Sequence, residues 1–485
     1  MAELLTIRFR QWWPPQALIA VAFCITLASS EPAHSDPAMA ELIGSLGFAK
    51  EEVGFVLVDL QSGRSLAENE ADELFMPASV AKLATAYAAE RILGPEFRFS
   101  TLLLRNGADL YLKGGGDPSL TVTDLSGLVQ SLPAGISQAI TGFFYDDSLL
   151  PEVHELNERQ PMAAVYNAGF GALNVDFNRI AVSWSRGGGG KLEFSASSIA
   201  DELSVPTDWI TFSSAAMDLP EGSQFVLDGT GADRWLYTSK LPDQGNTFLP
   251  VKNPGLNTAL VFRQVAKLAG LDVPIPQRAQ GPKEAVVVAH FESQPLMNIV
   301  AGILRYSNNI SAELIGLATS HKLTGQFPTI GDSCQTLTEW LQAQRPEMNW
   351  RGFHLENHSG FSSETRVSPR QMVGLLELLA NDSNIVQLLP AIPSETAQPT
   401  APQLIGKSGT MDYALGFAGY IVHGDAPRFA FAIFVFDRKR RAELDASMDR
   451  RIVEPSPEAR EWISRARTLE HAVLQRWIGS LAAGG

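Results

Sequence analysis

A change in sequence pattern partway along the chain limits the folds that it can adopt. Residues 77–93 are rich in Ala, Leu, Lys and Glu and carry a proline at their start, which predicts a helix. From about residue 97 to 282, short β-like runs such as 110–112 alternate with glycine-rich loops. Helical character returns at residues 294–325. We therefore expect an α/β body that is interrupted by a long, largely β insertion.

Segments near the two ends of the chain supply further elements of this body. Residues 54–60 (GFVLVDL) predict a buried strand. The aromatic and β-branched runs 417–422 and 429–436 predict a hairpin joined by a short turn. Residues 457–481 place apolar side chains at helical spacing, so we expect an amphipathic helix packed on a sheet.

The N-terminal residues have the pattern of an export signal. Two arginines precede a mostly apolar run at residues 17–30, and small and polar residues follow it. A permanent membrane anchor needs about 20 apolar residues, so a cleaved signal is the favoured interpretation. We expect residues 1–35 to be removed and the protein to be exported, to the periplasm, without an integral membrane anchor.

Charge and cysteine content narrow the possible partners and chemistries. The chain of 485 residues has a formal net charge of −15, which argues against nucleic acid because phosphate binding needs a basic face. After signal cleavage only Cys334 remains, so no disulfide can form within one chain. The sequence contains no G-x-S-x-G, H-E-x-x-H or Cys/His zinc spacing, and neither a metal nor another cofactor is expected.

The segment Met76–Lys82 (MPASVAK) carries a candidate nucleophile. Ser79 and Lys82 stand three residues apart, hence on one face of the predicted helix and within reach of a hydrogen bond. A serine hydroxyl needs a base to take its proton, and a lysine in a desolvated pocket can lose its charge and serve as that base. An S-x-x-K pair also arises by chance on solvated helix faces, so it needs support from elsewhere.

Two later stretches supply that support. Ser307–Asn309 reads S-x-N, and Lys407–Gly409 reads K-S-G, a near match to K-T-G. The order S-x-x-K, S-x-N, K-[ST]-G matches the penicillin-recognising serine acyltransferases. Residues 406–408 could instead end a phosphate-binding loop, but the first glycine of that motif would fall on Ala401, and a hairpin rather than a helix follows.

Further stretches share their pattern with one branch of this superfamily. They are residues 110–120, 146–148, 166–178, 307–314 and 357–362. On these residues, and on the long interval between the first two motifs, the chain resembles the penicillin-binding proteins of D-alanyl-D-alanine carboxypeptidase/endopeptidase type that carry a large insertion.

The resemblance implies a fold class and a division into domains. The expected fold is α/β, with a transpeptidase/β-lactamase-like body in which helices cover both faces of an antiparallel sheet. Residues 36–96 and 283–485 would form this catalytic body. Residues 97–282 would form the β-rich insertion.

The resemblance also implies a mechanism that acts on peptidoglycan stem peptides. Ser79 would attack the carbonyl of the penultimate D-alanine while Lys82 takes its proton. Ser307, in contact with Lys82 and Lys407, would relay a proton to the leaving amine, and Asn309 would orient Lys82 and the substrate. β-Lactams would form a long-lived ester at Ser79.

A second set of residues would bind the substrate's terminal carboxylate. Lys407 would supply positive charge, and the hydroxyls of Ser408 and Thr410 would supply hydrogen-bond donors on the strand that contains Gly409. The backbone N–H groups of Ser79 and Thr410 would hold the oxyanion.

Two positions are assigned to substrate binding on weaker grounds. Asp117, in the glycine-rich loop 113–120, is expected to approach the active-site mouth, although a turn Asp before a proline often only caps backbone N–H groups. Related proteins commonly carry a substrate-binding Arg where this chain has Ser363, so Arg366 is a candidate to replace it.

The segment Tyr306–Asn309 (YSNN) allows two registers. It can be S-x-N from Ser307, or the Y-x-N of class C β-lactamases and esterases from Tyr306. The residues that follow favour Ser307, with Tyr306 turned away as a packing aromatic.

Residues 155–157 (ELN) resemble part of the E-x-x-L-N loop of class A β-lactamases. In those enzymes the Glu of this loop activates the water that removes the acyl group. Here Val153 stands where the pattern requires that Glu, and the segment precedes Ser307 rather than following it. Fast β-lactam hydrolysis is therefore not expected.

Two other classes of function remain open on the sequence. One is a related serine hydrolase, such as a D-aminopeptidase, an esterase or a weak β-lactamase. The other is a non-catalytic scaffold that binds the cell wall. The sequence makes no prediction about the oligomeric state.

Overall fold

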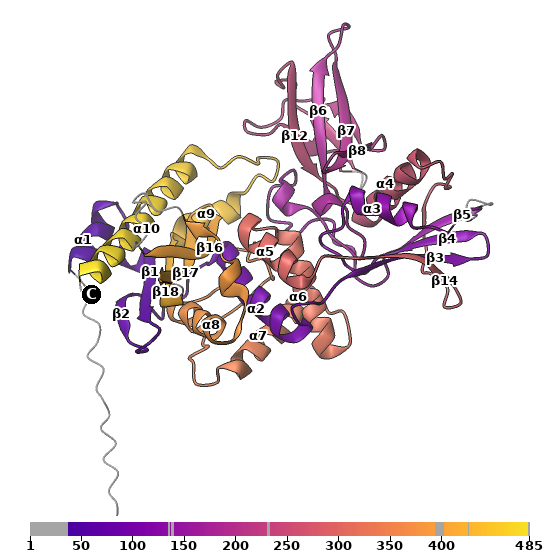
Figure 1. Cartoon of the computed structure of the whole chain (residues 1–485). Helices are drawn as coiled ribbons and strands as arrows, with labels where there is room; N and C mark the ends of the chain where they lie inside the picture. Colours follow the sequence, from indigo (N-terminus) through magenta and orange to yellow (C-terminus); the bar gives the residue numbers. More distant parts are fainter. Residues whose placement is uncertain are drawn as a thin grey trace, which may run out of the picture.

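The chain forms a body and an insertion that extends from it (Figure 1). The computed structural model describes residues 37–133, 136, 140–229, 233–392, 402–424 and 426–483. The predicted signal peptide, residues 1–35, lies outside the described residues. Among the residues that are described, no helix combines the length and the apolar composition needed to cross a membrane.

A six-stranded antiparallel sheet is the centre of the body, with the strand order β15-β16-β17-β18-β1-β2. Its strands are β1 (Val53–Asp59), β2 (Ser65–Asn69), β15 (Ala391–Ile392), β16 (Gln403–Met411), β17 (Ala414–His423) and β18 (Ala426–Phe436). The predicted strand at residues 54–60 and the predicted hairpin are therefore confirmed. Strand β1, from near the N-terminus, pairs with β18, from near the C-terminus.

Successive side chains of the sheet point into two different cores, as the period of a strand requires. On one face, Phe431 and Ile433 pack with α1 (Pro37–Ser45) and α10 (Pro457–Ala483). This confirms the predicted amphipathic helix. On the other face lie α2 (Lys82–Leu93), α5 (Leu296–Tyr306), α6 (Asn309–Thr324), α7 (Ile330–Gln344) and α8 (Pro369–Asp382). Helices thus cover both faces, as expected for this fold class.

The described part of the insertion contains three small sheets, and the upper one projects from the molecule in Figure 1. The first sheet contains β3 (Ser100–Asn106), β4 (Asp109–Lys113), β5 (Gly142–Asp146), β13 (Gln277–Arg278) and β14 (Val286–Glu292). The second contains β6 (Arg179–Arg186), β7 (Leu192–Ala200), β8 (Leu203–Pro206) and β12 (Gln244–Pro250). The third contains β9 (Thr211–Ser214), β10 (Phe225–Leu227) and β11 (Arg234–Tyr237). Helices α3 (Val122–Gln130) and α4 (Pro254–Leu268) pack together in the core of the first sheet.

The sheet of β3 extends past the predicted end of the insertion at residue 282. Strand β14 pairs with β3 in antiparallel register, with Phe291 opposite Thr101. Since this pairing joins residues far apart in the sequence, no local pattern could show it. We therefore propose to place the end of the insertion after β14.

A segment between α9 (Arg438–Ser447) and α10 connects the body to the insertion. In this segment, residues 448–456, the guanidinium of Arg450 forms an ion pair with Glu155 at 2.5 Å. The backbone of Arg450 also accepts a hydrogen bond from Met162 N at 2.9 Å. We call residues 448–456 the strap, because they bridge the two parts of the molecule.

Candidate active site

The predicted Ser–Lys pair stands at the start of α2. Residues Ala78–Ala81 form a 3₁₀ turn, and α2 begins at Lys82. The Lys82 Nζ atom donates to Ser79 Oγ at 2.8 Å, so the two side chains meet as the spacing predicts. Lys82 is fully buried, and Ser79 lines a cleft of about 880 Å³.

Three oxygen atoms hold the Lys82 amine. Besides Ser79 Oγ, they are Asn309 Oδ1 at 2.7 Å and the carbonyl oxygen of Ser359 at 2.8 Å. Burial lowers the pKa of Lys82 well below its usual value, and the nearby charge of Lys407 lowers this pKa further. A lysine whose pKa is lowered in this way is suited to act as a general base.

A break between two helices presents Ser307 and Asn309 to the cleft. The sequence predicts helical structure throughout residues 294–325, but α5 ends at Tyr306, and Ser307 follows it with a left-handed φ of 60°. Asn308 then caps α6 by accepting a hydrogen bond from Ser311 N at 2.9 Å. This break lets Ser307 and Asn309 both line the cleft, although they flank a helix junction.

Lys407 reaches the same site from β16. Its Nζ atom donates to Ser307 Oγ at 3.0 Å and to the Ser408 carbonyl oxygen at 2.6 Å. Burial lowers the pKa of Lys407 to about 8. The structure thus brings together Ser79, Lys82, Ser307, Asn309 and Lys407. Ser307 was expected to contact both lysines. Among the described residues it hydrogen-bonds to Lys407, and no hydrogen bond joins it to Lys82.

The β16 strand lies directly against the 3₁₀ turn that carries Ser79. A Cβ atom on Gly409 would lie 2.7 Å from Ser79 N and 2.5 Å from the Pro77 carbonyl oxygen, so this close approach requires glycine. Thr410 follows and lines the cleft, while Ser408 is exposed beside it. The backbone of the K-S-G strand therefore runs within reach of the nucleophile.

Asp117, which was expected to contact the substrate, is not among the residues that line the cleft. Its side chain is only 1% exposed and lies inside its own turn, where Oδ1 accepts from Ser119 N at 2.8 Å and from Ser119 Oγ at 2.7 Å. Burial raises the pKa of Asp117 to about 6. The simpler interpretation of a turn aspartate is the one that the structure supports.

We expect Asp117→Asn to raise the melting temperature above pH 6 and to leave hydrolysis unchanged. The folded-state pKa of about 6 exceeds the ordinary value of 3.8, so the stability contributed by the protonated carboxyl is complete below pH 3.8 and is lost as the pH rises through about 6. A neutral amide avoids that loss. Melting curves at pH 5 and pH 8 measure the difference.

The matched control for this substitution is Asp146→Asn. Asp146 sits in a similar turn, but it accepts from Gly281 N at 3.0 Å and lies 3.9 Å from the Lys113 amine. Removing its charge should lower the melting temperature at pH 8. Equal shifts for both variants, or slower hydrolysis by Asp117→Asn, would contradict the buried-turn assignment.

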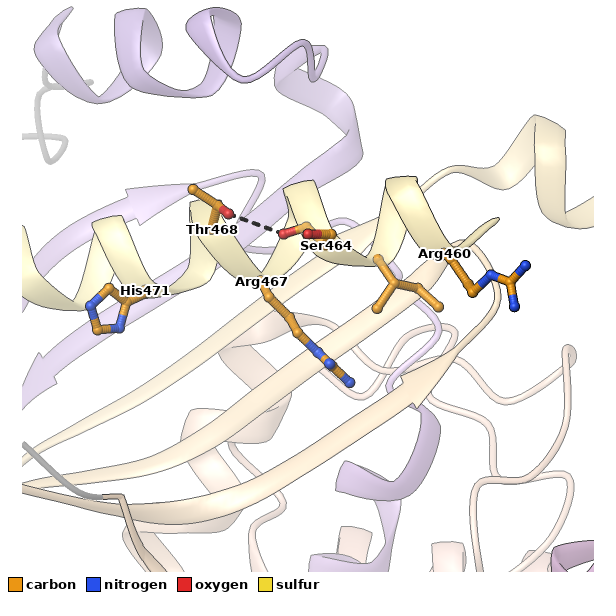
Figure 2. Close-up of a pocket in the computed structure, with 6 residues that line it drawn as sticks. Arg460, Ser464, Arg467, Thr468 and His471 are labelled. Carbon is orange, nitrogen blue, oxygen red and sulfur yellow. Dashed lines mark hydrogen bonds between the residues drawn. The ribbon is translucent and has the colours of Figure 1, made fainter. Parts of the chain in front are cut away.

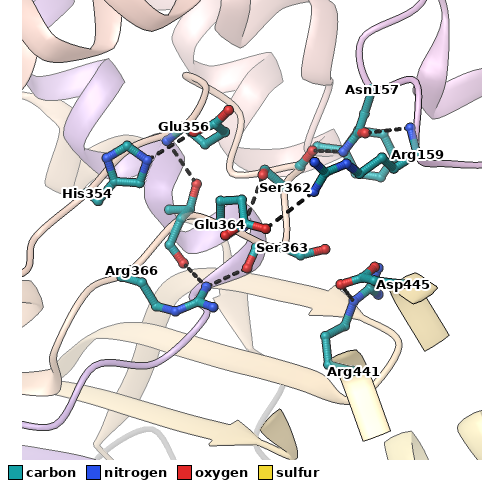
Figure 3. A network of polar contacts seen from close by, with 12 residues as sticks. Asn157, Arg159, His354, Glu356, Ser362, Ser363, Glu364, Arg366, Arg441 and Asp445 are labelled. Carbon is teal, nitrogen blue, oxygen red and sulfur yellow. Dashed lines mark hydrogen bonds and ion pairs between the residues drawn. The ribbon is translucent and has the colours of Figure 1, made fainter. Parts of the chain in front are cut away.

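Arg366 is also placed differently from the expectation. Figure 3 shows its guanidinium pointing toward the backbone of the residues just before it. There it donates to the carbonyl oxygens of Ser363 at 2.5 Å and Thr365 at 2.9 Å. The same group lies over the Phe436 ring at 5.4 Å. Arg366 does not line the cleft and instead holds this loop in shape.

An arginine that the sequence did not point to does line the cleft, Arg441 of α9. It is 3% exposed, and its guanidinium binds Asp445 and the Asp412 carbonyl oxygen, the latter at 3.3 Å. It therefore supports the turn that follows β16. An Arg–Asp pair four residues apart on a helix resembles a surface ion pair, so no sequence signal identifies it.

The position of Tyr306 corrects a further expectation. The sequence predicts that this ring turns away and packs, but it is 75% exposed and lines the cleft. The guanidinium of the neighbouring Arg305 lies 5.4 Å from the centre of its ring. Ser307, in contrast, contacts Lys407, so the S-x-N register is the one that reaches the other motif residues.

A second hollow lies along α10 and shares Arg460 and Ile463 with the cleft that contains Ser79. Figure 2 shows its polar side chains along the helix: Arg460, Ser464, Arg467, Thr468 and His471. Its labelled residues all come from one helix, and no nucleophile–base pair is among them. Elsewhere in the described parts of the chain, no group of three His, Cys, Asp or Glu side chains is arranged to hold a metal ion.

A sheet covered by helices on both faces carries a buried lysine that is hydrogen-bonded to a serine at the start of α2. This combination defines a serine acyltransferase with a transpeptidase-like body. The chain belongs to the D-Ala-D-Ala carboxypeptidase 3 (S13) family, whose profile matches residues 38–453. It is accordingly a serine peptidase of the penicillin-binding, D-alanyl-D-alanine carboxypeptidase type.

Relatives agree with this membership along most of the chain. The D-alanyl-D-alanine carboxypeptidase DacB of Haemophilus influenzae is 22% identical over 455 residues, which are 85% of this chain and 91% of that protein. The D-alanyl-D-alanine carboxypeptidase of Actinomadura sp. (strain R39) is 26% identical over 301 residues, 56% of this chain and 54% of that protein.

A solved structure supports the fold. The crystal structure of penicillin binding protein 4 (dacB) from Haemophilus influenzae superposes with a TM-score of 0.69 at 18% identity, covering 90% of this chain and 99% of that one. The same protein has also been solved in complex with a β-lactam, with a TM-score of 0.66 to this chain.

Proposed function

We propose that the protein hydrolyses D-alanyl-D-alanine bonds of peptidoglycan stem peptides, as a carboxypeptidase and as an endopeptidase, through an acyl-enzyme on Ser79. The observation that carries this proposal is the buried Lys82 amine, 2.8 Å from Ser79 Oγ. Family membership supports the class of substrate.

In acylation, Ser79 Oγ attacks the carbonyl carbon of the penultimate D-alanine and Lys82 takes its proton. Lys407, with a pKa of about 8, keeps its own proton near neutral pH, and its charge favours the neutral form of Lys82. The N–H groups of Ser79 and Thr410 would hold the oxyanion, where one such donor is worth about 3–4 kcal/mol.

Departure of the amine needs a proton. Ser307 accepts a hydrogen bond from Lys407, which leaves its own hydroxyl proton free to be donated to the leaving nitrogen. Lys407 then replaces that proton. Water hydrolyses the acyl-enzyme and releases the shortened peptide.

A β-lactam ester at Ser79 should be long-lived because Val153 stands where the class A β-lactamase loop carries its catalytic Glu. Glu155, within the residues that resemble that loop, is held by Lys252 at 3.4 Å and by Arg450 at 2.5 Å. It therefore serves the contact between insertion and strap.

Product analysis on purified muropeptides tests the proposal. Incubation with a monomeric pentapeptide muropeptide should release one D-alanine, and incubation with a cross-linked dimer should yield monomers, both detected by mass spectrometry. Removal of an N-terminal residue would indicate a D-aminopeptidase. Hydrolysis of a simple ester with no action on either muropeptide would indicate an esterase.

We expect Ser307→Ala to slow acylation by penicillin about 10²–10³-fold, the range for losing a proton-transfer group. Tyr306→Phe is the matched control, because it removes a hydroxyl from the neighbouring exposed ring and should change the rate little. Stopped-flow labelling with a fluorescent penicillin measures both. The opposite ranking would favour the Y-x-N register and the class C esterase-like group.

We also propose that the protein is exported to the periplasm. The pattern of residues 1–35 supports a cleaved signal, and peptidoglycan lies outside the cytoplasm. Cell fractionation, followed by N-terminal sequencing of the mature protein, tests this. A cytoplasmic protein that retains residues 1–35 would contradict it.

A further inference from the structure

A buried carboxylate lies one helical turn beyond Asn309. Glu313 of α6 is fully buried, and each of its oxygens accepts a different backbone N–H group. Oε1 accepts from Ser359 N at 2.9 Å and Oε2 accepts from His358 N at 3.0 Å. A protonated carboxyl would have a hydroxyl to donate, so two accepted N–H groups suit the ionised form.

This carboxylate is linked to the catalytic lysine through a single residue. Ser359 donates its N–H to Glu313, and its carbonyl oxygen accepts from Lys82 Nζ at 2.8 Å. Asn309, on the same face of α6 as Glu313, accepts from the same amine at 2.7 Å. Helix α6 therefore sets two of the three partners of Lys82, one directly and one through Glu313.

The charged groups around Glu313 and Lys82 show what Glu313 contributes to the site. The facing titratable groups are Lys82 on α2, Lys407 on β16, Cys334 on α7, and His358 in the same loop as Ser359. Burial lowers the pKa of His358 to about 3 and raises that of Cys334, so both are neutral. Burial and Lys407 lower the pKa of Lys82, whereas Glu313 raises it.

We propose that Glu313 is a positioning residue for acylation, which holds the Ser359 carbonyl on the Lys82 amine and stabilises the ammonium formed when Lys82 takes the Ser79 proton. The proton passes from Ser79 Oγ to Lys82 Nζ as the bond from Oγ to the substrate carbonyl carbon forms. In this role Glu313 stays ionised: burial raises its pKa, whereas the N–H groups of Ser359 and His358 and the charge of Lys82 lower it. This role rests on the proposed function, because it requires Lys82 to be the base.

The test is the pH dependence of acylation by a fluorescent penicillin. In Glu313→Gln the charge that raises the pKa of Lys82 is absent, so neutral Lys82 persists to lower pH. We expect the acidic limb of the rate profile to move down by about one pH unit or more, the size of effect that a close opposite charge has. The plateau rate should fall, since the amide can accept only one of the two N–H groups.

Glu90→Gln is the matched control. Glu90 is also a buried carboxylate, 6% exposed, and it accepts from Asn384 N at 2.9 Å at the far end of α2. This variant should lower the melting temperature and leave the acidic limb in place. An unmoved limb in Glu313→Gln would overturn the proposal, since loss of folded protein alone lowers the plateau without moving the limb.

Glu313→Asp provides a second, independent variant. It keeps the charge but is one methylene shorter. We therefore expect the acidic limb of the rate profile to stay at the pH of the wild type, while the plateau rate falls about tenfold or more, as for a misplaced catalytic group. A wild-type plateau would contradict the positioning role. If the unaltered protein itself were not acylated, the proposed function would fail; acylation of the unaltered protein with an unmoved limb in Glu313→Gln would remove only this inference.

Discussion

Replacing Ser79 by alanine is expected to abolish covalent labelling by penicillin while the fold stays intact. The substitution removes the oxygen that would form the ester, and no other hydroxyl is predicted to replace it at the start of α2. Lys82 loses one of its three partners but keeps Asn309 and the Ser359 carbonyl. Intact-protein mass spectrometry after incubation with penicillin measures the adduct, and a melting curve checks the fold.

A nearby serine provides the control for this result. Ser311 is 2% exposed and hydrogen-bonds to Asn308 in the first turn of α6, outside the cleft. Ser311→Ala should therefore keep the full mass increase. A mass increase that persists in Ser79→Ala would remove Ser79 as the nucleophile and with it the proposed acyl-enzyme.

Replacing Lys82 is expected to have the second-largest effect. Lys82→Ala should slow acylation about 10²–10⁴-fold, the usual contribution of a general base. Lys82→Arg is the more specific variant, because a guanidinium keeps the positive charge but cannot give up its proton near neutral pH. It should be slow as well.

The rates are read from time courses of penicillin labelling at several pH values. Near-normal acylation by Lys82→Arg would show that the lysine acts through its charge alone. That outcome would move the base role to another group and would leave Ser79 as the nucleophile.

Local patterns predict the parts of the site that depend on short-range geometry. The spacing of Ser79 and Lys82 on one helix face gives the observed contact, and the alternation along β18 gives the two cores. The order of the three motifs along the chain predicts that Ser307 and Lys407 belong to the same site, and the structure shows a hydrogen bond between them.

Features that depend on tertiary burial could not be predicted in this way. Asp117 lies in a loop with the composition of a binding loop, yet its own turn encloses it. Glu313 looks like an exposed helical glutamate, since such residues are rarely buried unless paired, and its partners come from a loop 45 residues later. The end of the insertion depends on the long-range pairing of β14 with β3.

The pairing of β1 with β18 affects the order in which the protein can fold during its synthesis. The side chains of β1 are almost all buried, and β18 leaves the ribosome only after the insertion is complete. The insertion pairs its strands within itself, so it can fold while β1 still lacks its neighbour. Contacts between such distant residues form slowly. The catalytic sheet is therefore the last part to assemble, and a chain that stops before residue 426 leaves an apolar strand open to aggregation.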